Sequence, residues 1–296
     1  MFISKQTHVF ALDRKNKPAA TTDLPARLTF ETIDCFSEQV RSEKDTLDFD
    51  RVNPATGPVY FNGVNPGDVI GVHISDIRVK SPGVMLAAPD FGVLGDKVDQ
   101  SRLKLLPIEN HEVIFNDRVR LPVAPMIGVI GVAPEKEAVN CGTPGDHGGN
   151  MDTTLIKPGA TVYFPVQVQG GLLAMGDLHA AMGDGEIMVS GVEVSGQVDV
   201  TVTRAYGLDI TMPLVKTDEV FSFIASDEDV YQAIEKATAA MAAFLTQKAG
   251  LSLSEGGMLM SAAGDVEISQ VVDPEKTARF SMPLAILRKL GVDTAF

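Results

Sequence analysis

Two glycine-rich segments concentrate the side chains that could do chemistry. The first reads DHGGNMD over residues 146–152, and the second reads GDLHAAMGDGE over residues 176–186. Each contains one of the five histidines of the chain, surrounded by carboxylates. Imidazole and carboxylate groups are the ligands of a hydrolytic zinc ion, which needs three protein groups and one open position for water. The two segments are therefore candidates for one metal-assisted site.

The first segment packs an imidazole, an amide and two carboxylates into seven residues: Asp146, His147, Asn150 and Asp152. The two glycines between them allow the backbone to turn, so that several of these groups can converge. An ordinary polar loop before the next strand is the alternative interpretation. On its own, a pair of glycines after a histidine does not distinguish a functional site from a polar loop.

In the second segment, Asp177 and His179 are two residues apart, so both side chains point to one side if the backbone is extended. Asp184 and Glu186 repeat that spacing. The dipeptide Asp184-Gly185 could instead form a simple hairpin turn. A strand pattern resumes at Met188, which places the segment at the rim of a sheet, where loops often carry functional residues.

Asp34 and Cys35 are weaker candidates. Asp34 ends a strand-like run, and an acid at such a position is often only a turn former. Cys35 could act as a thiol nucleophile with a histidine as its base, although no neighbouring sequence feature predicts a lowered thiol pKa. Both residues stay in consideration for the chemistry.

The elements that must position these groups are mainly strands. Up to about residue 220, short apolar runs are separated by turn residues every 8 to 12 positions, which is typical of an all-β sandwich or barrel. The clearest runs are ARLTFETID (26–34), DVIGVHISDIRV (68–79), ATVYFPVQV (160–168) and GQVDVTVTRA (196–205). We expect a mainly β fold whose β-sandwich or barrel body spans residues 1–220 and carries the site. This body forms either one unit or two related β-halves.

Residues 221–296 have a different pattern. An amphipathic run predicts a helix that begins after Ser226 as its N-cap and stops at Gly250. A strand-like DVEISQVVD and a final PLAILRKL follow. We expect a small α+β part packed on the body.

Composition limits the possible partners. Of the 296 residues, 45% are hydrophobic, which is enough to form a large core. The net charge of −14 repels polyanionic partners. We therefore expect a small-molecule partner, no nucleic acid and no membrane. The first twenty residues contain neither a signal peptide nor an apolar span, which favours a cytoplasmic location. Two cysteines provide no disulfide framework.

Taken together, several long motifs resemble the acetamidase/formamidase family of metal-associated amide hydrolases. The resemblance covers nearly the whole chain and includes DCFSEQV (34–40), NPATGPVYFNGVNPGDVIGVHI (53–74), PMIGVIGVAPE (125–135), HGGNMD (147–152), GDLHAAMGDGE (176–186) and MSAAGDVEISQVVD (260–273). It implies a mostly β fold, cleavage of short aliphatic amides to acid and ammonia, and a homo-oligomer. The family's usual GDPHA is GDLHA here, with Leu178 in place of proline.

The resemblance marks these segments as functional, and amide chemistry suggests the individual roles. Water must be activated, the developing oxyanion held and the leaving nitrogen protonated. We predict His147, Asp177 and His179 as ligands of a divalent metal, zinc in the first place and calcium as the alternative. Glu186 or Asp34 would carry the proton, and Asn150 or glycine amides would face the oxyanion. A non-catalytic small-molecule-binding oligomer and a thiol amidase using Cys35 are the alternatives.

Overall fold

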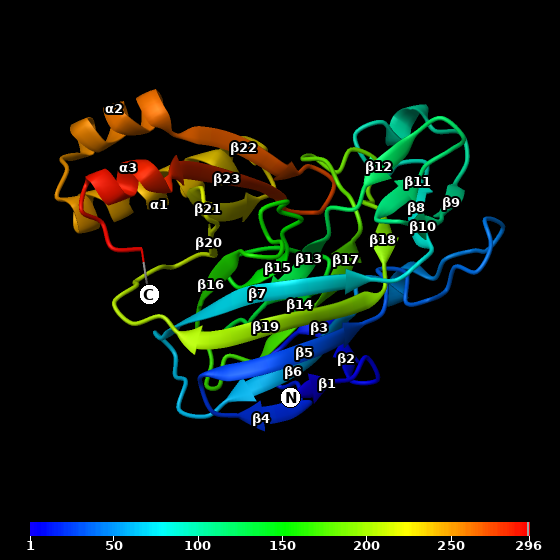
Figure 1. Ribbon diagram of the computed structural model, residues 1–296, viewed down its shortest axis with the longest axis horizontal. Helices are drawn as coiled ribbons and strands as arrows, with labels where there is room; N and C mark the ends of the chain where they lie inside the picture. The colour runs from blue at the N-terminus through cyan, green and yellow to red at the C-terminus, as the bar shows by residue number, and fades with distance from the viewer. Residues whose placement is uncertain (295) are drawn as a thin grey trace.

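The computed structural model describes residues 1–294 and 296, which form two large sheets with helices at one end (Figure 1). The first sheet has nine strands in the order β1 (Phe2–Ile3), β5 (Ala26–Thr32), β19 (Gly196–Arg204), β7 (Val69–Val79), β16 (Thr161–Pro165), β20 (Leu214–Lys216), β21 (Val220–Asp227), β23 (Lys276–Pro283) and β22 (Asp265–Gln270). All four strand runs singled out in the sequence lie in this sheet, as β5, β7, β16 and β19.

The second sheet carries the glycine-rich segments. Its main path is β15 (Gly148–Asn150), β13 (Met126–Gly131), β17 (Leu173–His179), β18 (Glu193–Val194), β8 (Gly83–Ala87) and β9 (Arg102–Leu106). Strand β6 (Ala55–Phe61) also pairs with β17, and it holds β2 (His8–Val9) and β4 (Ala20–Thr22). Neither sheet closes on itself within the described residues, so the body is a sandwich and the barrel alternative does not apply.

Smaller elements complete the body. A three-stranded sheet contains β10 (Ile108–Glu109), β11 (Glu112–Ile114) and β12 (Arg120–Pro122), and β3 (Ala11–Leu12) pairs with β14 (Val139–Asn140). Two short 3-10 helices are η1 (Phe49–Arg51) and η2 (Gly95–Lys97). Alternating side chains of the two large sheets meet in the main core, where Phe30, Ile127 and Met175 are fully buried.

The predicted C-terminal α+β part is present, with one correction at its first helix. The helices are α1 (Val230–Ala249), α2 (Leu253–Ala263) and α3 (Leu284–Lys289). The N-cap of α1 is Asp229, whose side chain accepts a hydrogen bond from the Tyr231 N–H at 2.7 Å. Ser226 does not cap the helix because it belongs to β21 and pairs with Thr277 of β23. Gly250 ends α1 with a φ of +68°, as its type predicts.

The C-terminal part extends the first sheet of the body. Strand β20 pairs with β16 on one side and with β21 on the other, so the hydrogen-bonded ladder runs through residue 220. A second core forms between this extension and the helices, including Met241 and Phe244 of α1. The division at residue 220 therefore separates two cores within one continuous sheet, and it stays a prediction as a domain boundary.

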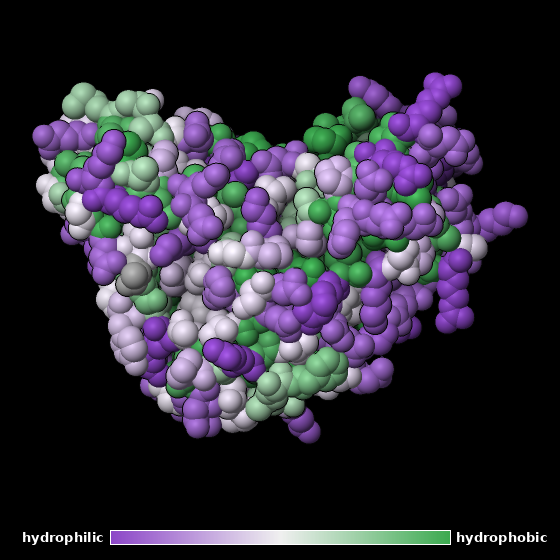
Figure 2. Space-filling model, viewed as in Figure 1, coloured by the Kyte–Doolittle hydropathy of each residue, from purple (hydrophilic) through white to green (hydrophobic). Residues whose placement is uncertain are grey.

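The surface of the molecule is hollowed along one edge (Figure 2). The hollow lies between the lobe of the three helices and the lobe that carries β8 to β12, and hydrophobic residues gather on its inner side. In the part of the chain that the structure describes, every helix is too short or too polar to cross a lipid bilayer.

Candidate active site

The candidate site forms where strand β17 changes its partner. Its first half pairs with β6, where Gly176 is opposite Ala55, and its last two residues pair with β18, where His179 is opposite Glu193. Asp177 lies between these two pairings, and its φ of +54° turns the backbone out of the regular strand conformation. The change of pairing partner from β6 to β18 thus coincides with a bend of β17 inside a buried sheet.

Three acidic residues of this region share an unusual backbone conformation. Asp152, Asp177 and Glu186 have φ values of +42°, +54° and +49°. Side chains other than glycine rarely adopt such values, and each instance costs on the order of 1–3 kcal/mol unless its surroundings fix it. Strained residues of this kind cluster at functional sites, and here all three bring carboxylates towards one point.

His179 is the centre of this arrangement. Its Nε2 atom lies 3.3 Å from a carboxylate oxygen of Glu193, 3.5 Å from one of Asp177 and 3.8 Å from one of Asp152. All four side chains are almost completely buried. Ligand atoms arranged as a tetrahedron around a zinc ion, with bonds of about 2.1 Å, are about 3.4 Å apart. The spacing of these atoms therefore suits a shared cation.

The buried polar atoms of the region lack partners. Among residues 1–294 and 296, several buried side-chain nitrogen and oxygen atoms have no hydrogen-bond partner. They include atoms of His147, Asn150, Asp152, Asp177, His179, Glu186 and Glu193. An unpaired buried carboxylate is costly unless a cation compensates it. The side chains Asp152, His179 and Glu186 also offer ligand atoms within 4.8 Å of one another, as do Cys35, Asp177 and Glu193. The residues present thus fit a metal ion.

The electrostatics of the cluster support the same conclusion. Burial lowers the pKa of His179, but Glu193 and Asp177 outweigh it and raise that pKa well above its ordinary value. Burial raises the pKa of Glu193 to about 8 against the opposing effect of His179. Burial, reinforced by Glu186, raises the pKa of Asp152 well above its usual range. One imidazolium cannot balance so many buried acids, so the cluster attracts further positive charge.

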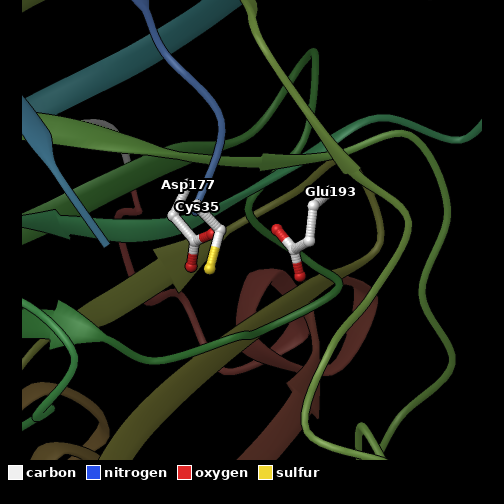
Figure 3. A group of neighbouring side chains, drawn as sticks. All are labelled: Cys35, Asp177 and Glu193. Carbon is white, nitrogen blue, oxygen red and sulfur yellow. The ribbon is translucent and has the colours of Figure 1, made fainter. Parts of the chain in front are cut away.

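Cys35 lies beside this cluster. Figure 3 shows its thiol next to Asp177, with the carboxylate of Glu193 directed towards both. The thiol donates a hydrogen bond to Oδ1 of Asn53 at 2.8 Å. Burial and the nearby carboxylates, Glu193 foremost, raise the pKa of Cys35 well above the value of a free thiol. A nucleophilic cysteine needs the opposite shift.

A cavity of about 290 Å³ leads to the cluster. Its polar lining comprises Cys35, Asn53, Asn140, Thr143, Asn150, Asp177, Glu186, Glu193 and Asp273, and its apolar lining comprises Phe36, Phe49, Val52, Leu86, Phe91, Val189 and Pro274. Three of the possible metal ligands, Asp177, Glu186 and Glu193, are therefore reached from a space large enough for a small organic molecule.

The structure brings together four of the six predicted site residues. Asp177, His179 and Glu186 belong to the cluster, and Asn150 lines the cavity. Nδ2 of Asn150 donates a hydrogen bond to Asp273 at 2.9 Å. The two glycine-rich segments therefore do converge on one region, as the sequence predicts.

Asp34 and His147 belong to neither group of possible metal ligands. The Asp34 carboxylate accepts a hydrogen bond from the Glu38 N–H at 2.9 Å, which is the turn-forming role that the sequence left open. His147 belongs to neither group of possible metal ligands, and burial lowers its pKa to about 4. Proton transfer by Asp34 and metal ligation by His147 stay predictions.

Sequence reasoning missed two acidic residues of the site, Glu193 and Asp273. Glu193 is a single charge in the apolar run Val192–Val194, and a charge inside a buried strand is a signal that could have identified it. Asp273 ends one of the motifs that carry the family resemblance. Asp152 lies in the first glycine-rich segment, where the sequence predicts His147 as the metal ligand.

A buried arginine holds the loop that presents Glu186. Arg279 of β23 forms ion pairs with Asp184 at 2.7 Å and Glu267 at 3.1 Å. The backbone of Gly185 also bridges to Gln270 of β22. Asp184-Gly185 is thus an anchored loop segment, and the C-terminal part contributes directly to the position of the site.

Gly128 of β13 leaves room for the carboxylates. A Cβ atom on this residue would lie 2.5 Å from Oδ1 of Asp152 and 2.5 Å from Oδ2 of Asp177. We expect Gly128→Ala to displace both groups and to lower kcat/KM for the substrate by at least 100-fold, since small displacements of catalytic groups cost about that much. Gly183→Ala is the matched control because an added Cβ there meets open space. Equal activity of the two variants would contradict this packing argument.

Known proteins of one family match this chain in sequence. The sequence model of the acetamidase/formamidase family matches residues 17–142 and 136–289. A formamidase from Methylophilus methylotrophus is 34% identical over 166 residues, which is 48% of this chain and 40% of that protein. A putative formamidase from Schizosaccharomyces pombe is 23% identical over 62% of this chain and 60% of its own length. The chain thus aligns with less than two thirds of these curated relatives.

Solved structures resemble the chain over its whole length. An acetamidase from Bacillus halodurans is 49% identical, with a TM-score of 0.97 over 99% of this chain and 100% of that one. A predicted acetamidase/formamidase from Thermoanaerobacter tengcongensis has the same identity and TM-score over 99% and 98% of the two chains. Both relatives share the fold that positions the cluster.

Proposed function

Because the chain belongs to the acetamidase/formamidase family, we propose that it hydrolyses carboxylic amides to the acid and ammonia by attack of a metal-activated water. The observation that carries the proposal is the buried cluster around His179, whose unpaired carboxylates face one imidazole next to a cavity. The amides named for its relatives, formamide and acetamide, are the first substrates to test.

A divalent ion, with zinc as the first candidate and calcium as the second, would be held by His179 and carboxylates drawn from Asp152, Asp177 and Glu193. Such an ion lowers the pKa of a bound water towards about 7 and polarises a carbonyl oxygen. A set of one imidazole and several carboxylates suits zinc, whereas calcium prefers oxygen ligands alone. The imidazole therefore favours zinc.

Glu186 fits the role of proton carrier. It lines the cavity, and its Oε2 atom lacks a hydrogen-bond partner among the described residues. Burial raises the pKa of Glu186 well above its ordinary value, so the group can hold a proton near neutral pH. The attacking water gives up a proton as its oxygen bonds to the carbonyl carbon. The C–N bond then breaks as the nitrogen takes a proton from Glu186 and leaves as ammonia, and the proton from water restores protonated Glu186. Glu186 is the residue that we assign to this transfer.

Asn150 fits the role of oxyanion donor. Its Nδ2 group has two hydrogens, and one of them is donated to Asp273. The second can face the carbonyl oxygen of an amide in the cavity, where a fixed donor stabilises negative charge as it develops. Asp273 thus orients the amide group.

The alternatives from the sequence have less support. Cys35 is a poor nucleophile in this setting because its raised pKa keeps the thiol protonated and its S–H is engaged by Asn53. A binding protein without catalysis would use the same cavity, but it would have no need for an unpaired proton carrier beside the cluster. The homo-oligomer stays a prediction that light scattering can test.

The experiment that tests the proposal is release of ammonia from formamide, acetamide and propionamide by purified protein supplied with zinc. We expect release that depends on native protein and survives in Cys35→Ser, because the thiol takes no part in bond cleavage. Loss of activity in Cys35→Ser, with the fold retained, would favour the thiol mechanism. A folded, metal-supplied protein that releases no ammonia from any of the three amides would leave the binding function as the better explanation.

A further inference from the structure

We propose that the preferred substrates are uncharged amides whose acyl group is apolar and larger than acetyl, such as alkyl amides of four to six carbons or aryl-alkyl amides. This inference rests on the proposed function, because it places the reacting amide at the cluster around His179. The feature that carries it is the lining of the cavity, which combines two groups of residues. Its apolar side includes Phe36, Val52, Leu86 and Val189, which belong to one hydrophobic cluster, and its polar side includes acids of the cluster around His179.

The apolar side is built from residues that the hydrolysis of formamide does not need. Phe36, Phe49 and Phe91 line it together with the aliphatic side chains of Val52, Leu86 and Val189. The polar side holds the acids Asp177, Glu186 and Glu193, the amides Asn53 and Asn150, and Cys35. An amide group placed at the polar side would therefore direct its acyl chain along a hydrophobic wall.

Two aromatic rings of this wall are stacked in an exposed position. The centroids of Phe49 and Phe91 are 5.3 Å apart and their planes differ by 11°. The two residues remain 47% and 40% exposed. Phe49 comes from η1 and Phe91 from the segment that follows β8, so two distant parts of the chain supply one aromatic surface. Exposed aromatic surface that continues a polar site is a common mark of ligand contact.

The size of the cavity supports the same substrate class. A water molecule occupies about 30 Å³ in the liquid, so 290 Å³ corresponds to roughly ten waters. Formamide and acetamide are no larger than a few waters, and they would leave the apolar wall uncovered. A charged acyl group would lose its hydration against Phe36, Phe49 and Phe91, because these side chains offer it no polar partner. An uncharged alkyl or aryl group fills the space without that penalty.

The first test is a kcat/KM profile over formamide, acetamide, butyramide, hexanamide and phenylacetamide with the zinc-supplied protein. Each methylene that the wall removes from water should raise kcat/KM by up to about fourfold. We expect hexanamide and phenylacetamide to exceed acetamide by at least tenfold. A profile that falls as the acyl group grows, while formamide is still hydrolysed, would overturn this inference and leave the proposed function intact.

The second test removes one ring of the pair. We expect Phe91→Ala to lower kcat/KM for hexanamide by about tenfold while kcat/KM for formamide stays unchanged, because formamide does not reach the ring. Phe2→Ala is the matched control, since Phe2 is 55% exposed and lies in β1, outside the cavity lining. Phe49→Ala should reproduce the effect of Phe91→Ala.

Two outcomes of this second test would count against the inference. One is an equal loss for formamide and hexanamide in Phe91→Ala, which would assign the ring a structural role only. The other is an unchanged substrate profile together with a smaller particle in light scattering, which would make the aromatic pair a contact between copies of the chain. Absence of turnover with every amide would overturn the proposed function, and this inference with it.

Discussion

Replacing His179 by glutamine should reduce amide hydrolysis by at least a thousandfold. Nε2 of His179 lies within 3.8 Å of the carboxylates of Asp152, Asp177 and Glu193, so this one atom joins the groups that we assign to the metal. Glutamine keeps a similar volume in a fully buried position but cannot reproduce the imidazole ligand. The quantity to measure is kcat/KM for the best amide, with the unfolding temperature recorded in parallel.

His73→Gln provides the matched control for this change. His73 lies exposed in β7, where its ring contacts Thr161, and we expect activity at the parental level. His147→Gln separates the structural assignment from the sequence prediction, because His147 lies outside both groups of possible ligands. Activity of folded His179→Gln above a tenth of the parental value would rule out His179 as the centre of the site. Loss of turnover in both His147→Gln and His179→Gln would instead support the sequence prediction, in which both histidines bind the metal.

The fold could be predicted from the sequence because its signals are local. Alternation of apolar residues and the turn residues beside them identified β5, β7, β16 and β19. The same reasoning misplaced the cap of α1 at Ser226, since local capping preference does not include the pairing of Ser226 with Thr277 across two strands. Long-range pairing overrode a local preference at that position.

The candidate site could be predicted only in part because its central contacts are not local. The spacing of Asp177 and His179 identified one half of it. Glu193 meets His179 through the pairing of β17 with β18, and fourteen residues of sequence separate the two. Asp152 points into the cluster because its φ is positive, a conformation that residue type alone does not predict. Periodicity assumes a regular backbone, and this site lies where the backbone departs from regularity.

Removal of metal should lower both activity and stability, and the stability change tests the metal without relying on turnover. A ligand present at about a thousand times its Kd stabilises the folded state by about 4 kcal/mol. We expect the free energy of unfolding to be larger in zinc than in a chelator by an amount of this order. The reason is that metal-free protein keeps several carboxyl groups buried with one imidazole between them.

The metal-free protein should also respond to pH in a defined direction. Glu193 has a pKa of about 8 in the folded protein and an ordinary value of 4.5, so the unfolded chain loses this proton first as pH rises. This carboxyl therefore contributes stability that is complete below pH 4.5 and is lost progressively as pH rises towards 8. In chelator, the free energy of unfolding of Glu193→Gln should fall less with rising pH than that of the parental protein. In zinc, the same variant should gain less stability from the metal. Denaturant unfolding at several pH values measures both effects.

Glu109→Gln is the control for this pair of measurements, since Glu109 is an exposed residue of β10 outside the cavity. It should show the parental response to zinc and the parental pH dependence. Equal free energies of unfolding in zinc and in chelator, for a protein that hydrolyses amides equally well in both, would exclude a metal from the site. The buried acids would then have to be neutralised by protons alone, and the activation of water would fall to a carboxylate of the cluster.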